Sequence, residues 1–94
     1  MNIDNLINKR VYFLAKDYLA YSRFIIKNKM NSKKFFFISN INVIIGMLDN
    51  SYLYILPNWT DRYDEVDIID QLKNKKYLTI NNTDDLVLIL NTIK

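Results

Sequence analysis

The sequence predicts an α/β fold: a small three-layer Rossmann-like sheet of about four mostly parallel strands, with helices on both faces. Short apolar runs rich in aromatic and β-branched residues alternate with segments of helical spacing. Strands that alternate with helices usually pair in parallel, because each connecting helix crosses one face of the sheet. With 94 residues and a half-hydrophobic composition, the chain fits one globular domain over residues 1–94.

The first half of the chain predicts two strands and two helices. The strands fall at residues 11–15 and 34–38, and the helices at residues 18–30 and 41–45. Asp17 is placed to cap the first helix, and Ser39 or Asn40 the short second one. Gly46 is the only glycine and stands where a helix C-cap favours it, although residues 41–48 also fit a strand.

In the second half of the chain, predicted strands again alternate with predicted helices. We predict strands at residues 52–56 and 77–80, a helix at residues 64–75, and a last helix capped by Thr83 or Asp84. Pro57 ends the third strand, because proline cannot donate to a sheet. The helix at residues 64–75 has acidic residues in its first turn and basic residues in its last, as the helix dipole favours. Residues 86–90 fit either a helix or a strand.

The composition excludes several kinds of chemistry. The chain has no histidine and no cysteine, so it has neither a histidine-based triad nor a thiolate metal site. A single glycine cannot build a glycine-rich phosphate loop. We therefore expect no catalytic residue, no cofactor and no metal. Aspartates recur at intervals of three, at Asp61, Asp64, Asp67 and Asp70. On a helix, the last three share one side and could hold a divalent ion, but we interpret them as a solvated acidic face. A metal-dependent enzyme using Asp17, Asp61 or Asp64 is the least favoured hypothesis.

The net charge of +3 is unevenly distributed along the chain. Residues 1–48 hold eight basic and two acidic residues, whereas residues 49–94 hold five basic and eight acidic residues. A basic surface suits an anionic partner, so a nucleic-acid or nucleotide-binding module is the alternative function. Its candidate residues are Lys16, Arg23, Lys27, Lys33 and Lys34. We favour an ordinary solvated surface, because these residues are interspersed rather than massed.

The predicted helix at residues 18–30 has two apolar stripes on roughly opposite sides. One contains Leu19 and Ile26, with Met30, and the other contains Tyr21, Phe24 and Ile25. A surface helix needs only one such stripe. We expect the tyrosine-containing stripe to face away from the sheet, as a partner-binding surface or as the contact of a homodimer. The other possibility is that a terminal segment covers it.

Ligands of open parallel sheets bind beyond the carboxyl ends of the strands. In this chain that edge is predicted to present Lys16, Asp17, Ser39, Asn40, Asn58, Trp59, Thr60 and Arg62. Trp59 and Arg62 together suit stacking on a base or docking on a protein. The competing interpretation is that Trp59 closes the core, as loop tryptophans often do.

The apolar runs Val11-Tyr12-Phe13-Leu14-Ala15, Phe37-Ile38-Ser39 and Tyr54-Ile55-Leu56-Pro57, with Phe24-Ile25-Ile26, Gly46 and Ile68-Ile69, resemble short uncharacterised phage-encoded α/β proteins. The resemblance covers roughly residues 10–76 and implies a viral or mobile-element source. It carries no catalytic signature. Our leading expectation is a non-enzymatic protein that docks on a host protein as an inhibitor, an anti-defence protein or a host-takeover factor. No signal peptide or membrane-length apolar run is visible, so we expect the host cytoplasm and no membrane.

Overall fold

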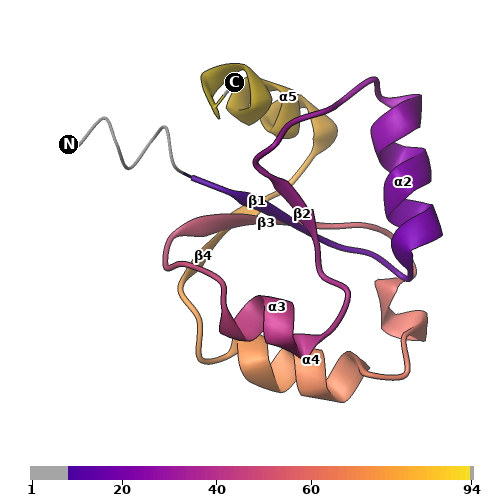
Figure 1. Ribbon diagram of the computed structural model, residues 1–94, viewed down its shortest axis with the longest axis vertical. Coiled ribbons are helices and arrows are strands. Elements are labelled where there is room, and N and C mark those ends of the chain that lie inside the picture. The colour runs from indigo at the N-terminus through magenta and orange to yellow at the C-terminus, as the bar shows by residue number, and fades with distance from the viewer. Residues whose placement is uncertain (1–8, 94) are drawn as a thin grey trace.

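The computed structural model describes residues 9–93 and shows four strands, four α-helices and one 3-10 turn in that range (Figure 1). In chain order these elements are β1 (Val11–Leu14), α2 (Tyr18–Lys27), β2 (Phe35–Phe37), α3 (Ile41–Ile45), β3 (Ser51–Ile55), η1 (Trp59–Asp61), α4 (Glu65–Leu72), β4 (Tyr77–Ile80) and α5 (Thr83–Ile93). The predicted order of strands and helices is confirmed. Both ambiguous segments contain helix, since residues 41–45 form α3 and residues 86–90 lie within α5.

The four strands form one sheet in the order β2-β1-β3-β4, and all three pairings are parallel. Val11 lies beside Phe35 on one side and beside Tyr52 on the other. The chain steps outward from β1 to β2 and then crosses back to β3. The strand order therefore reverses between β1 and β3, and this is where open α/β sheets form a crevice at the carboxyl ends of their strands.

Helices cover both faces of the sheet, as predicted (Figure 1). Val11 and Phe13 of β1 belong to the core cluster under α2 and α5, whereas Tyr12 and Leu14 belong to the cluster under α3 and α4. All four side chains are buried. Because successive side chains of a strand point to opposite faces, burial on both faces explains why this strand is a continuous apolar run.

Local side-chain caps define the starts of three helices. Asp17 Oδ1 accepts a hydrogen bond from the Ala20 backbone N–H at 2.8 Å, and Asn40 Oδ1 accepts one from Asn42 at 2.9 Å, as two of the predictions state. The predicted caps of the last helix are wrong, because Asn82 Oδ1 accepts from the Asp85 N–H at 2.8 Å.

Among the described residues, no helix has both the length and the apolar character needed to cross a membrane.

The predicted orientation of α2 is wrong. Tyr21, Phe24 and Ile25 pack against the core cluster of the sheet, whereas Leu19 and Ile26 are 55% and 73% exposed. Aromatic rings bury more apolar area than aliphatic side chains, so the sheet takes the stripe that contains Tyr21 and Phe24. The homodimer predicted from this stripe loses its basis, because the stripe is covered within the chain.

Candidate functional site

A hollow of about 480 Å³ opens at the carboxyl ends of β1 and β2. It is lined by Lys16, Asp17, Tyr18, Phe37, Ser39, Asp61, Arg62 and Tyr63. Three connections supply these residues: the loop after β1 with the start of α2, the end of β2, and η1 with the residues after it. The parallel sheet thus brings together segments that lie far apart in the sequence, at the edge where sequence reasoning expects a ligand.

The Arg62 side chain forms hydrogen bonds across this edge of the sheet. Its Nε and Nη2 donate to the two carboxylate oxygens of Asp64 at 2.8 and 3.0 Å. Its remaining N–H groups donate to backbone carbonyls: Nη1 to Ala15 at 3.1 Å and to Ile38 at 2.6 Å, and Nη2 to Ser39 at 2.9 Å. A guanidinium has five N–H donors, and all five are used. Arg62 therefore ties the ends of β1 and β2 to the start of α4.

This arrangement corrects the prediction that Arg62 contacts a partner. Its side chain is 6% exposed and its charge is neutralised by Asp64, whose side chain is 9% exposed. The guanidinium also lies over the Phe37 ring, 5.8 Å from the ring centroid. A phosphate or a base could reach these donors only if existing hydrogen bonds broke. Arg62 is a structural residue of the site.

The ion pair also changes the titration of Asp64. Hydrogen bonds from Arg62 lower the pKa of this carboxyl below its usual value, and the charge of Arg62 acts in the same direction, although burial of the carboxyl opposes both. A carboxyl whose pKa is lower in the folded than in the unfolded chain stabilises the fold when it is ionised. This contribution is complete above the pKa of the unfolded chain and is lost as the pH falls through the folded-state pKa.

We therefore expect the free energy of unfolding to fall more steeply below about pH 4 in the wild-type protein than in Asp64→Asn, since about 3.9 is the ordinary pKa of aspartate. Urea unfolding at pH 7, 5, 4 and 3 measures this difference. The variant should be less stable at pH 7 and should lose less stability on acidification, because it has no carboxylate at position 64 to protonate. The same acid dependence in both proteins would contradict the role of the ion pair.

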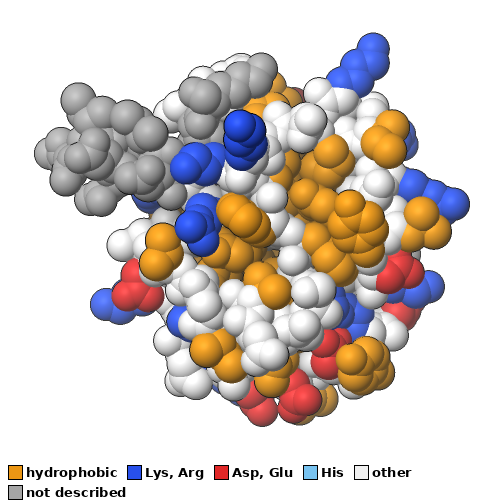
Figure 2. All heavy atoms as spheres, viewed as in Figure 1, with side chains coloured by type: hydrophobic (Ala, Val, Ile, Leu, Met, Phe, Trp, Pro, Cys, Tyr) orange, Lys and Arg blue, Asp and Glu red, His pale blue; other side chains and the backbone are white. Residues whose placement is uncertain are grey.

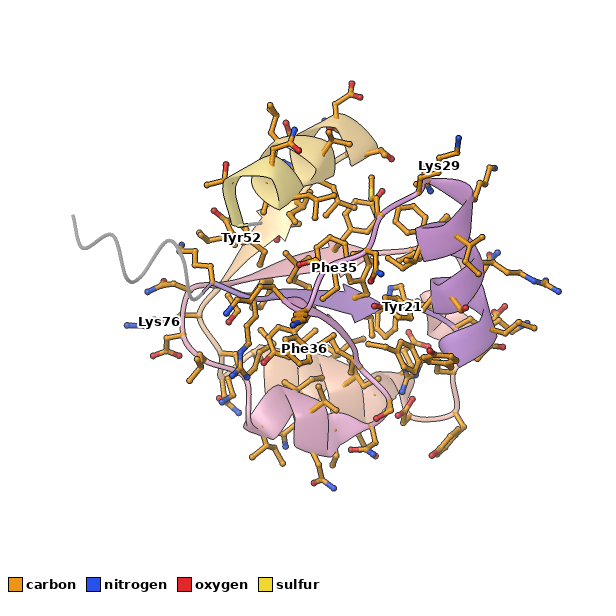
Figure 3. All side chains as sticks on the ribbon, turned by 45° about the horizontal axis from the view of Figure 1, so that its top comes forward. Tyr21, Lys29, Phe35, Phe36, Tyr52 and Lys76 are labelled. Carbon is orange, nitrogen blue, oxygen red and sulfur yellow. The ribbon has the colours of Figure 1, made fainter. Side chains whose placement is uncertain are left out.

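Aromatic rings line the hollow and pack beside it: Tyr18, Phe37 and Tyr63 line it, and Tyr21 packs against Tyr18 and Phe37. The Tyr21 and Phe37 rings stack with their centroids 5.5 Å apart, and the Tyr18 ring lies 5.8 Å from Tyr21 and 5.7 Å from Phe37. Tyr21 lies between α2 and the sheet (Figure 3). Burial, with a smaller effect of Tyr18, raises the pKa of Tyr21 above its usual value, so its hydroxyl is neutral at physiological pH.

Tyr18 and Tyr63 point into solvent at the rim, with exposures of 64% and 98%. Sequence reasoning singled out neither residue. Tyr63 is an aromatic residue in a polar loop, and this was the only signal that could have found it. Trp59, which was singled out, does not line the hollow. It is half-buried and packs against the core cluster under α3 and α4, in agreement with the competing interpretation that it closes the core.

The carboxylates do not gather into a metal site. Asp64 is paired with Arg62, and Asp17 caps α2. In the part of the chain that the structure describes, no three acidic residues lie close enough together to hold an ion. Two carboxylates, those of Asp17 and Asp61, still line the hollow beside Lys16, which forms no ion pair with any residue in 9–93.

The five basic residues of the nucleic-acid alternative do not share one surface. Lys16 lines the hollow, and Arg23 and Lys27 are exposed on α2. Lys33 and Lys34 directly precede β2, at the opposite edge of the sheet.

In comparisons with known proteins, no family model, no curated protein and no solved structure matches this chain. Its function has to be inferred from the side chains that the fold brings together.

Proposed function

We propose that this protein is a non-enzymatic binding module that docks on a protein partner through the hollow at the carboxyl ends of β1 and β2. The observation that carries the proposal is the exposure of Tyr18 and Tyr63, which line one hollow together with Phe37. Single exposed aromatic residues are common. Two exposed tyrosines beside one hollow resemble the tyrosine-rich centre of a protein–protein interface, where a few side chains supply most of the binding energy.

The charges around the hollow favour a cationic side chain of the partner. The charge of Arg62 is compensated by Asp64, so Asp17 and Asp61 outnumber Lys16 at the rim. An arginine of the partner would suit both features, because a guanidinium stacks on aromatic rings and pairs with carboxylates. The resemblance to phage-encoded proteins supports a host protein as the target, with inhibition of that protein as the outcome.

The test is affinity purification from host lysate with three versions of the protein. Tyr18→Ser/Tyr63→Ser removes the rim rings. Leu48→Ser/Leu88→Ser removes two side chains that are 56% and 65% exposed and do not line the hollow, and it serves as the matched control. We expect one partner to be retained by the wild type and the control and lost by the tyrosine variant. Its affinity, measured with the purified partner, should fall at least tenfold, since hot-spot residues contribute about 2 kcal/mol or more each.

Asp61→Asn should weaken binding of the same partner without changing the stability of the module, since Asp61 is exposed and forms no ion pair among the described residues. Equal loss of the partner in the tyrosine variant and the leucine control would point to non-specific adhesion. Either this result or capture of no partner would overturn the proposal.

A further inference from the structure

The amino ends of the four parallel strands lie at one edge of the sheet, here called the amino edge, and basic residues gather there. Seven of the thirteen basic residues stand directly before a strand or in the turn that leads into one. They are Lys9 and Arg10 before β1, Lys33 and Lys34 before β2, and Lys73, Lys75 and Lys76 before β4. Figure 2 shows basic side chains at the left of the molecule, where β1 begins in Figure 1, and others at its right, where α2 lies.

Backbone hydrogen bonds fix the strand ends that carry three of these residues. The Lys34 carbonyl accepts from Val11 N–H at 2.9 Å, the Arg10 carbonyl from Tyr52 at 2.9 Å, and the Lys76 carbonyl from Asn50 at 2.8 Å. Lys34 and Arg10 are therefore in register at the ends of the neighbouring strands β2 and β1. Lys76, at the end of β4, is one position out of that register and is separated from Arg10 by β3. Neighbouring strands are about 4.8 Å apart, so the three residues span roughly 14 Å along the edge of the sheet.

Two cations are held in place by aromatic rings. Lys9 Nζ lies 5.0 Å from the centroid of the Tyr52 ring, and Arg10 Cζ lies 5.1 Å from that of Phe36. Tyr52 and Phe36 pack on opposite faces of the sheet, and Figure 3 shows them with Lys76 toward this side of the molecule. Because the cations lie over these half-buried rings, the rings offer no open face on which a base could stack.

Few acidic groups oppose this charge. Of the acidic residues in 9–93, only Asp49 stands before a strand, and Asp70 lies 3.9 Å from Lys73. Most of the others lie at the opposite edge, after β1, after β3 or at the starts of α4 and α5. Lys75 is occupied, since its Nζ donates to the Ile45 carbonyl at 2.8 Å and the Met47 carbonyl at 3.3 Å. The other five cations, Lys9, Arg10, Lys33, Lys34 and Lys76, form no ion pair within the part of the chain that the structure describes.

Helix dipoles explain only part of this separation between basic residues at the amino edge and acidic residues at the opposite edge of the sheet. Helices of a parallel α/β fold begin at the carboxyl ends of the strands, where the dipole favours acids, and end near the amino edge, where it favours bases. Lys73 at the end of α4 fits that rule. Lys9, Arg10, Lys33 and Lys34 belong to segments that enter strands, and no helix ends at these residues. Their gathering therefore needs another reason, and binding of an anion is the simplest one.

We propose that the amino edge binds the phosphate backbone of nucleic acid without reading its sequence. Cations spread along one edge of a sheet suit a polymer that carries a regular line of negative charge, and phosphate contacts carry no sequence information. The function would be independent of protein docking at the hollow, which lies at the other end of the strands. A protein with both surfaces could hold its partner near nucleic acid.

Fluorescence anisotropy with labelled 20-nucleotide DNA, single-stranded and duplex, of two unrelated sequences tests the proposal. Five phosphate contacts predict a slope of log affinity against log salt of about −3.5 for single strands and −4.5 for duplex. Affinity for single strands should thus fall on the order of 100-fold between 50 and 200 mM salt. The two sequences should bind with equal affinity.

Two variants with equal loss of charge locate the site. Lys33→Gln/Lys34→Gln/Lys76→Gln changes the amino edge, and Lys16→Gln/Arg23→Gln/Lys27→Gln changes the hollow and α2. We expect the first to bind DNA at least tenfold more weakly than the wild type, and the second to stay within about threefold; thermal unfolding checks that both are folded. Equal losses in both variants, no DNA binding at 50 mM salt, or tighter binding of poly-glutamate than of DNA would overturn the proposal. The last result would assign the surface to an acidic protein.

Discussion

Replacing Arg62 with alanine is expected to lower the free energy of unfolding by about 3–5 kcal/mol, the range measured when one partner of a buried ion pair is removed. The variant leaves the Asp64 carboxylate with 9% exposure and no cation. It also removes the donors to the carbonyls of Ala15 and Ile38. A domain of this length has a total stability of only about 5–14 kcal/mol. A large fraction of the protein should therefore unfold at moderate urea concentration.

Arg62→Lys separates the charge from the geometry. Lysine keeps the positive charge but has three donors on a single nitrogen, so it cannot reach Asp64, Ala15 and Ile38 together. We expect it to recover only a small part of the loss. Arg23→Ala is the matched control, because Arg23 is exposed on α2 and should leave the urea midpoint unchanged. Full rescue by lysine, or similar midpoints for both alanine variants, would contradict the structural role of Arg62.

The role of Arg62 also shows what sequence reasoning cannot reach. Its partners Ala15 and Ile38 lie 47 and 24 residues away along the chain. An arginine in a loop after a strand looks like a free cation, and nothing local indicates that five acceptors converge on it. Strands and helices depend on neighbouring residues, and they were predictable for that reason. The sheet order β2-β1-β3-β4, which brings these carbonyls together, depends on long-range packing.

The prediction of which side of α2 faces the sheet was wrong for a related reason. Helical spacing correctly separated Tyr21, Phe24 and Ile25 from Leu19 and Ile26, but it wrongly grouped Met30 with the exposed pair, since Met30 lies beyond the end of α2 and is buried in the core. Periodicity also does not say which stripe faces the sheet. The choice depends on the partner surface, and here Phe13 and Phe37 provide aromatic contacts for Tyr21 at 5.2 and 5.5 Å. Comparing the stripes by buried area, and not by number of apolar residues, would have favoured the observed orientation.

The amino edge was visible in the sequence but was missed. Basic pairs directly precede the strands at residues 11–14, 35–37 and 77–80, and a parallel sheet brings all its amino ends to one edge. Counting charge by chain halves hid this pattern, because Lys75 and Lys76 fall in the acidic half. A count by strand end would have predicted the surface, given the parallel topology that the sequence already indicated.

Phe13→Ala is expected to cost about 3–5 kcal/mol, comparable to the loss of Arg62 but by a different mechanism. Phe13 is fully buried at the centre of β1. Four rings surround it, with centroid distances of 4.9 Å to Phe35, 5.2 Å to Tyr21, 5.6 Å to Tyr54 and 6.0 Å to Phe24. These rings come from α2, β2 and β3, so the cavity cannot close unless several elements shift together.

Phe13→Leu should recover much of the loss, because leucine fills most of the space left by the ring. Tyr63→Ala is the matched control: it also removes an aromatic ring, but that ring is 98% exposed, and the urea midpoint should not change. Unlike Arg62→Ala, Phe13→Ala should cost the same at pH 7 and pH 3, since it alters no charge. A loss for Phe13→Ala no larger than that for Tyr63→Ala would contradict the central position of Phe13 in the core.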